Sequence, residues 1–288
     1  SEIHYHPADA SPAEQAAGFS NQDSFEFLET MNTGAVPVDL TNVAFSGGVT
    51  FDFASIPDPG DRLLAPGARL LLANNEAAFA FRYGSTPTVG QYSGALDNGG
   101  ETLALSLNEI TEILSVTYLD DLPWPTPSDG AGYSLVLTVP SAGIDHDDPA
   151  NWQPSSSSGG SPGASSTVLF TGDPHGDDNF DGVDNLVHFA LTPEIASPPS
   201  PGISFQSFDD GGGPEDFPVF TFQRNLAASV EVTAEFSPDL VTWTSLDPAT
   251  ALVSLVHQGD GTSLYSFRSA LPRSSERGQF FRLSVAIP

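Results

Sequence analysis

Short runs of alternating apolar and polar residues, separated by turn signals rich in Gly, Pro, Asn and Asp, recur along most of this chain. Successive side chains of a β-strand point to opposite faces, so an alternating run of about four to eight residues can bury one face and leave the other in water. Between the runs stand turn sequences such as Asn32-Thr33-Gly34, Pro57-Asp58-Pro59-Gly60 and Asp97-Asn98-Gly99-Gly100. This pattern predicts a succession of hairpins and disfavours a fold built from long helices.

Two groups of such runs are separated by a stretch with little apolar surface. The first group covers residues 25–31, 36–45, 69–73, 102–107, 113–118 and 133–139, and the second covers 220–222, 230–236, 252–256, 264–267 and 280–286. Residues 154–166 between them are Ser, Gly and Pro with a single Ala. A segment of this composition has too little apolar surface to fold, so we expect a flexible connector there.

The length of 288 residues fits two domains better than one, because a domain usually has about 100 to 200 residues. We therefore predict an all-β fold with two β-sandwich domains. The first spans residues 1–153 and the second residues 199–288. Residues 154–198 form a linker that carries an acidic loop and a short helix.

The strongly negative charge limits the kinds of molecule that this chain can bind. Against 37 Asp and Glu the chain has 8 basic residues, all of them Arg, and its formal net charge is -29. Such a surface repels phosphate backbones and anionic lipid and favours divalent cations, so we expect no nucleic-acid partner. No apolar stretch reaches the roughly 18 residues of a membrane span, so we expect no membrane insertion.

Cysteine is absent, which excludes disulfides and thiolate metal sites. No Ser lies in a Gly-x-Ser-x-Gly elbow either, so no nucleophile stands out. Glu26 and Glu29 are three apart on one predicted strand, on opposite faces, and cannot form an acid–base pair. No basic leader precedes Ser1, so we expect a mature or trimmed chain.

A series of short motifs in the first half has the order of a known family. It begins with Glu2-Ile3-His4-Tyr5, Phe25-Glu26-Phe27-Leu28-Glu29 and Val38-Asp39-Leu40, and continues with Leu64-Ala65-Pro66-Gly67, Leu96-Asp97-Asn98-Gly99-Gly100-Glu101, Trp124-Pro125 and Gly160-Ser161-Pro162-Gly163. Over residues 1–165 the chain resembles the bacterial lamin-tail domain. The resemblance implies an immunoglobulin-like sandwich that displays a surface or links modules rather than catalysing a reaction.

The C-terminal part carries a looser resemblance. Phe222-Gln223-Arg224-Asn225, Ser237-Pro238-Asp239-Leu240, Trp243 and Phe280-Phe281-Arg282-Leu283 are similar to the closing β module of large secreted bacterial proteins. The two resemblances together imply an extracellular or cell-surface location.

The strongest local motif is an acidic loop in the predicted linker. Oxygen-bearing side chains at positions 1, 3 and 5, a Gly at position 6 and a backbone carbonyl at position 7 match a calcium loop of the EF-hand or dockerin type. These residues are Asp177, Asn179, Asp181, Gly182 and Val183. Position 12 is His188 where a bidentate Glu is usual, so Asp184 or Asp173 would have to complete the calcium shell.

A helix is predicted to follow this loop, since Leu186, Phe189 and Ala190 recur at helical spacing up to Leu191 and Thr192-Pro193 ends the pattern. The alternative to a calcium site is a solvated acidic turn in which Asp181 or Asp184 caps the helix. Two weaker cation candidates are the pair His4 and His6 and the acidic run 145–148, which also suit surface decoration and a polar turn.

We therefore predict a non-catalytic extracellular module for display, adhesion or structure, stabilised by calcium, whose partner is a protein or glycan at a cell surface. One alternative is a subunit that associates with itself into a surface fibre or layer through free edge strands. The other is a calcium-dependent carbohydrate-binding or hydrolytic module, for which Trp124, Trp152 and Trp243 are the stacking candidates.

Overall fold

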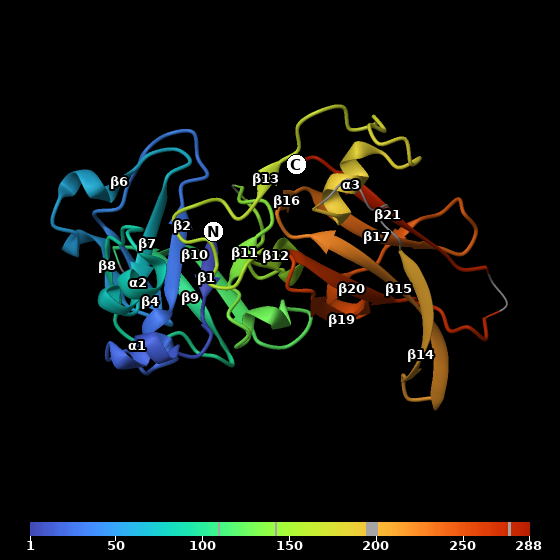
Figure 1. Cartoon of the computed structure of the whole chain (residues 1–288), viewed down its shortest axis with the longest axis horizontal. Helices are drawn as coiled ribbons and strands as arrows, with labels where there is room; N and C mark the ends of the chain where they lie inside the picture. Colours follow the sequence, from blue (N-terminus) through green and yellow to red (C-terminus); the bar gives the residue numbers. More distant parts are fainter. Residues whose placement is uncertain (109, 142, 194–200, 276–277) are drawn as a thin grey trace. The chain divides into compact units, whose positions relative to one another are not determined.

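A computed structural model of the chain describes residues 1–108, 110–141, 143–193, 201–275 and 278–288 (Figure 1). The predicted β-rich character is confirmed, since 38% of the chain forms strands and 15% forms helices. The chain divides into two compact units, Ser1–Ser166 and Thr167–Pro288. The predicted start of the second domain at residue 199 lies outside the described residues.

Unit 1 contains a six-stranded sheet in the order β12-β11-β1-β2-β7-β8, a four-stranded sheet in the order β10-β9-β4-β5, and the pair β3-β6. The strands are β1 (Glu2–His4), β2 (Phe27–Met31), β3 (Val38–Asp39), β4 (Val43–Gly47), β5 (Phe51–Asp52), β6 (Leu63–Leu64), β7 (Arg69–Ala73), β8 (Gly90–Gln91), β9 (Gly100–Leu107), β10 (Thr111–Leu119), β11 (Leu135–Leu137) and β12 (Trp152–Pro154). The helices are α1 (Pro12–Ala16), α2 (Glu76–Tyr83) and the short 3-10 turns η1 (Gln22–Phe25), η2 (Phe53–Ser55), η3 (Pro59–Arg62), η4 (Thr126–Ser128) and η5 (Pro149–Asn151).

The main core of unit 1 is built from the alternating faces of both large sheets. Ile3, Leu28 and Leu72 of the six-stranded sheet belong to the same buried cluster as Phe45 and Leu103 of the four-stranded sheet. Burying side chains of this size removes roughly 25 cal/mol of unfavourable hydration per Å² of apolar surface. The apolar residues of the alternating runs thus form the core of this unit, as the sequence pattern predicts.

Helix α2, which the sequence pattern did not predict, covers the other face of the six-stranded sheet. Asn75 starts it by accepting the N–H groups of Ala77 and Ala78 at 3.1 Å. Phe79 and Tyr83, four residues apart on one side of the helix, place their rings 5.8 and 5.6 Å from that of Phe27. The sheet is consequently buried on both faces.

One predicted strand of unit 1 is divided. Residues 36–45 form β3 and β4, because Asp39 Oδ1 accepts the N–H and O–H groups of Thr41 at 2.9 and 2.6 Å and turns the chain between them. The predicted strand that begins at Phe25 starts at Phe27 instead, since Phe25 ends the turn η1.

Unit 2 contains a four-stranded sheet in the order β14-β15-β20-β19, a three-stranded sheet in the order β18-β17-β21, and the parallel pair β13-β16. The strands are β13 (Val168–Leu169), β14 (Gly202–Asp209), β15 (Pro214–Asn225), β16 (Ala228–Ser229), β17 (Glu231–Ser237), β18 (Thr244–Ser245), β19 (Leu252–His257), β20 (Thr262–Arg268) and β21 (Phe280–Ala286). The helices are α3 (Asn185–Leu191) and α4 (Pro248–Ala251).

The core of unit 2 joins its two larger sheets to α3. Phe222 and Tyr265 of the first sheet, Phe236 of the second and Leu186 and Leu191 of α3 belong to one buried cluster. The predicted helix after the acidic loop is thus confirmed as α3, and it belongs to unit 2. Within the described ranges, no helix is long and apolar enough to cross a membrane.

Candidate functional site

The acidic loop lies between β13 and α3, and its carboxylates bind the backbone of the loop itself. Asp177 Oδ1 accepts the N–H of Asp181 at 3.1 Å, and Asp177 Oδ2 accepts that of Gly182 at 2.9 Å. Asp181 Oδ1 in turn accepts the N–H of Val183 at 2.9 Å. Phe180 and Gly182 have φ angles of 58° and 86°, a left-handed conformation that lets the chain turn this tightly. Positions 1, 5, 6 and 7 of the predicted loop therefore belong to one closed turn.

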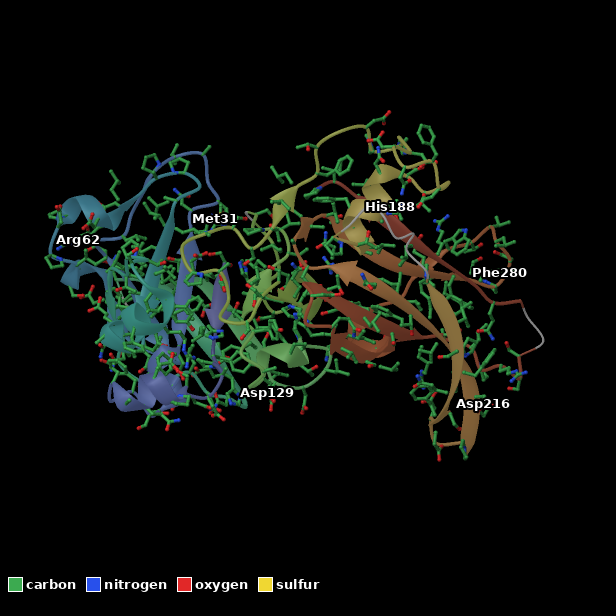
Figure 2. All side chains as sticks on the ribbon, in the orientation of Figure 1. Met31, Arg62, Asp129, His188, Asp216 and Phe280 are labelled. Carbon is green, nitrogen blue, oxygen red and sulfur yellow. The ribbon has the colours of Figure 1, made fainter. Side chains whose placement is uncertain are left out.

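His188 of α3 reaches this turn from the position where Glu is usual. Its side chain, labelled in Figure 2, is 2% exposed, and by distance Nε2 lies 2.8 Å from Asp181 Oδ2 and 3.3 Å from Asn179 Nδ2. Burial opposes ionisation of Asp181, but the hydrogen bonds from His188, Val183 and Asn179 outweigh it and lower the pKa of this carboxyl. An imidazole nitrogen thus stands where a calcium loop has a carboxylate.

Asp184 does not join this group. Its Oδ2 lies 3.1 Å from Nδ1 of His175, and both side chains are exposed. Neither Asp181 nor Asp184 caps α3 with its side chain. Asp181 Oδ1 accepts the N–H of Val183, and the first two helical N–H groups, those of Asn185 and Leu186, are accepted by the backbone carbonyls of Gly176 and Pro174. Across the described residues, no group of three or more His, Cys, Asp or Glu side chains is arranged to hold a metal ion.

Of the predicted ligands, the structure brings together Asp177, Asn179, Asp181 and the backbone of Val183. Asp173, the other residue predicted to complete the shell, accepts the N–H of His175 through Oδ1 at 3.1 Å. A carboxylate has about four lone-pair sites, so oxygens that each accept one N–H here keep a lone pair for a hard cation.

A second group of carboxylates lies on the α2-covered face of the six-stranded sheet, and sequence reasoning missed it. Glu2 and Glu29 are direct partners in the β1–β2 ladder, and they are 2% and 4% exposed. Glu2 accepts the N–H and O–H of Ser161 at 2.9 and 2.8 Å, and Glu29 accepts the N–H of Gly163 at 2.8 Å. Arg69 Nε lies 2.9 Å from Glu29 Oε1. Burial raises the pKa of Glu2 although the bonds from Ser134 and Ser161 oppose this.

These contacts tie down the segment that the sequence predicts to be a flexible connector. We name residues 157–163 the strap. Its N–H and O–H groups supply the donors that two buried carboxylates need. Gly160 has a φ of 73°, and a Cβ there would collide with Glu2 Oε1 and lie 2.9 Å from Ser134 Oγ. The observed units also divide at Ser166 rather than at residue 153, because the strap packs on unit 1.

Glu26, just before β2, is a further buried carboxyl. It is fully buried, and its Oε2 accepts the O–H of Tyr92 at 3.0 Å, the N–H of Leu96 at 3.0 Å and the amide of Asn74 at 3.2 Å. Its Oε1 has no partner among the described residues. Burial raises the pKa of Glu26 to about 8, although the bonds from Leu96, Tyr92 and Asn74 oppose the shift.

A perturbed pKa is frequent in active sites, but the hydrogen bonds to Glu26 join segments of the fold to one another. Tyr92 and Leu96 come from the segment after β8 and Asn74 directly follows β7, so this carboxyl fastens both segments to the start of β2. Glu29 has different partners, which agrees with the prediction that Glu26 and Glu29 cannot act as a pair.

The weaker metal candidates have structural contacts too. His4 is fully buried and stacks on Phe27 at 5.1 Å, and burial lowers its pKa to about 3. His6 instead places Nδ1 2.6 Å from Asp129 Oδ1. In the run 145–148, Asp147 Oδ1 accepts the N–H of Thr117 at 2.6 Å. His4 therefore belongs to the core, His6 forms a surface pair with Asp129, and Asp147 holds a turn against β10.

The Trp residues offer little free stacking surface. Trp124 and Trp152 are buried together in unit 1 with ring centroids 6.0 Å apart. Trp243 in unit 2 is half-buried, and the guanidinium of Arg282 lies 4.2 Å from its ring centroid. A sugar would have to displace that guanidinium or use the remaining exposed part of Trp243.

Replacing Glu2 by Ala should release the strap, because Ser161 and Ser134 lose a buried acceptor. We expect a loss of about 2–4 kcal/mol in the free energy of unfolding of unit 1 and faster hydrogen exchange at the amides of Ser161 and Gly163. Glu112→Ala on the exposed part of β10 is the matched control. Unchanged protection of the strap amides in Glu2→Ala would show that the carboxylate does not hold the strap.

Replacing Glu26 by Gln should remove a pH dependence of stability. The pKa of this group is about 8 in the folded state, against 4.5 for the free side chain. The folded state therefore keeps a proton that the unfolded chain loses, and stability falls as pH rises from about 4.5 to about 8, by up to about 1.4 kcal/mol per pH unit. Urea unfolding of both proteins between these pH values measures the difference. Parallel curves for the wild type and Glu26→Gln would contradict this assignment.

No family model, no curated protein and no solved structure matches the chain. The resemblance of residues 1–165 to the lamin-tail domain accordingly stays a prediction.

Proposed function

We propose that the chain is a non-catalytic structural and display module of an extracellular protein, with calcium bound by the acidic loop. The observation that carries the proposal is that the buried carboxylates hold distant segments of the chain together. Glu2, Glu26 and Glu29 each accept hydrogen bonds from segments distant in sequence. Glu14 is held by Arg82 through bonds of 2.7 and 2.9 Å. Groups that hold the fold in this way are not poised for proton transfer to a substrate.

The architecture that we propose is two β-sandwiches, the first immunoglobulin-like and of the lamin-tail type. Support comes from the core of unit 1, to which both large sheets contribute their inward faces. The core of unit 2 likewise combines residues of its two larger sheets. A sandwich suits display, because its surface loops and edges vary without disturbing the packed interior.

The calcium part of the proposal rests on the closed turn at Asp177–Val183. The turn already aims the carboxylates of Asp177 and Asp181 at its own centre, as their bonds to Gly182 and Val183 indicate. Because His188 replaces the usual bidentate Glu, we expect weak binding in the range of about 0.1 to 1 mM that extracellular modules show. Binding this weak matters only where calcium is abundant, which favours a location outside the cell.

The partners that we propose are a protein or a glycan at a cell surface. A net charge of -29 disfavours polyanions and leaves neutral or cationic surfaces as the compatible partners. Carbohydrate binding has the weaker support of the two, because Trp124 and Trp152 are buried. Hydrolysis has less support still, since the buried carboxylates have structural partners.

Calcium should raise the melting temperature of the wild type and release heat in titration calorimetry. Asp181→Asn should weaken both effects, since it removes the charge at position 5 of the loop and keeps only a neutral amide oxygen there. His188→Glu should instead tighten calcium binding about tenfold, because it restores the bidentate carboxylate. Asp121→Asn, an exposed acid in unit 1, is the control for general charge effects. An equal response to calcium in Asp181→Asn and Asp121→Asn would place the cation elsewhere.

A screen of polysaccharide and ester substrates tests the non-catalytic part. We expect no turnover above background with the wild type, because the described carboxylates that are buried are engaged by structural donors. Turnover that disappears in Glu26→Gln or Glu2→Gln, with the fold intact by circular dichroism, would identify an enzyme and refute the proposal.

A further inference from the structure

Strand β14 is an edge strand whose outer side is not paired by any described residue. It ends the four-stranded sheet of unit 2 and pairs with β15 alone, over eight consecutive residue pairs from Gly202–Thr221 to Asp209–Pro214. Residues 214–218 of β15 form a strand ladder only with β14, so this part of the hairpin extends beyond β20 (Figure 1), where the carbonyls of Asp216 and Pro218 accept the N–H groups of Arg273 and Ser269. An edge of this length presents a row of free N–H and C=O groups.

The other long edges in the large four-stranded sheets carry protective irregularities. The β10–β9 ladder shifts register between Glu112 and Leu114, and Asp147 Oδ1 occupies the N–H of Thr117 on β10. The β19–β20 ladder shifts register between Leu252 and Ser254. The β14–β15 ladder has no such shift, and residues 202–208 contain no charged residue and no Pro.

The free edge also presents apolar side chains on one face. Ile203 and Phe205 are 56% and 50% exposed, and their register opposite Phe220 and Pro218 puts them on the face that continues into the core of unit 2. The guanidinium of Arg273 lies 4.5 Å from the ring centroid of Phe205. A monomer gains nothing from exposing both side chains, whereas a neighbouring strand would bury them.

The hairpin is held rigid on its other face. The rings of Phe208 and Phe217 are 5.9 Å apart, and Arg268 lies 4.9 and 4.6 Å from their centroids. Arg268 also forms an ion pair of 2.9 Å with Asp210 in the turn. A strand that is already ordered loses little conformational entropy when a partner pairs with it.

We propose that β14 pairs antiparallel with β14 of a second copy of this chain, so that two four-stranded sheets become one sheet of eight strands. The charge distribution favours this partner. The acids of the hairpin lie at and next to its turn. They are Asp209, Asp210, Glu215 and Asp216, of which Figure 2 labels Asp216. Antiparallel pairing about a two-fold axis carries the two acidic turns to opposite ends and brings only uncharged residues together. A parallel arrangement would set the acids side by side.

The pairing is self-limiting. A two-fold contact uses the β14 edge of both copies, so the assembly closes as a dimer and does not grow into a fibre. Ile203 and Phe205 of each copy would then lie on the same face as their counterparts and bury one another. This inference goes beyond the proposed display function, because a display module can be monomeric.

Sedimentation velocity of the full chain over a range of concentrations tests the pairing. We expect a monomer–dimer equilibrium that strengthens from about 0.15 M to about 1 M salt, because the net charge of -29 repels copies until it is screened. Gln206→Lys should abolish the dimer, since it brings two like charges to the centre of the paired strands. The control is Val256→Lys, with the same charge change on the exposed part of β19 at the opposite edge of the sheet.

Both variants reduce the net negative charge and so weaken long-range repulsion equally. Loss of the dimer in Gln206→Lys alone is therefore a local effect at β14, and Ser204→Lys should repeat it if Gln206→Lys proves unstable. Concentration-dependent protection of the β14 amides in hydrogen exchange is the direct readout. A wild type that stays monomeric in high salt, equal association of both variants, or filaments instead of dimers would each overturn the proposal.

Discussion

The six-stranded sheet of unit 1 is covered on both faces, and the other features of this unit follow from that constraint. One face meets the four-stranded sheet through Ile3, Leu28 and Leu72. The other meets α2 through Phe27, so that even the residues alternating with Ile3 and Leu28 are withdrawn from water. Two of those residues are Glu2 and Glu29, and a buried carboxylate is tolerated only where donors surround it. The strap and Arg69 supply these donors.

The Arg side chains of this acidic chain also supply donors to carboxylates. With eight Arg and no Lys, each cation can both neutralise a carboxylate and cover an aromatic ring. Arg82 does so in unit 1, where it binds Glu14 and lies 3.4 Å from the ring centroid of Phe25. Arg282 does so in unit 2, between Glu235 and Trp243. The planar guanidinium suits both contacts better than a Lys ammonium would.

The acidic loop and the β14 edge concern different aspects of function. The loop packs His188 and α3 against the core of unit 2, so a cation there would stabilise this unit from within. The edge presents an ordered, uncharged strand to the outside. The proposed cation site and the proposed pairing edge both suit a structural role in which the rest of the acidic surface remains free for other contacts.

Sequence alone determined the features that depend on neighbours along the chain. Alternation identified most strands, turn signals separated them, and helical spacing after the acidic loop placed α3 within one residue at its start. The turn at Asp177–Val183 was also predictable, because Asx bonds form between residues two to five apart. Strand β14 was missed although residues 203–206 alternate between apolar and polar, because both faces of the strand are exposed.

Tertiary structure alone decided which charged residues are buried. Glu2 and Glu29 lie far apart in the sequence, and only the β1–β2 register makes them neighbours. Ser161 and Gly163 look like linker residues because their composition carries no apolar signal, yet their N–H groups are the partners that those carboxylates require. Local sequence patterns indicate which apolar side chains share a buried face. The partner of a buried polar group comes from a distant segment, and no periodicity encodes that contact.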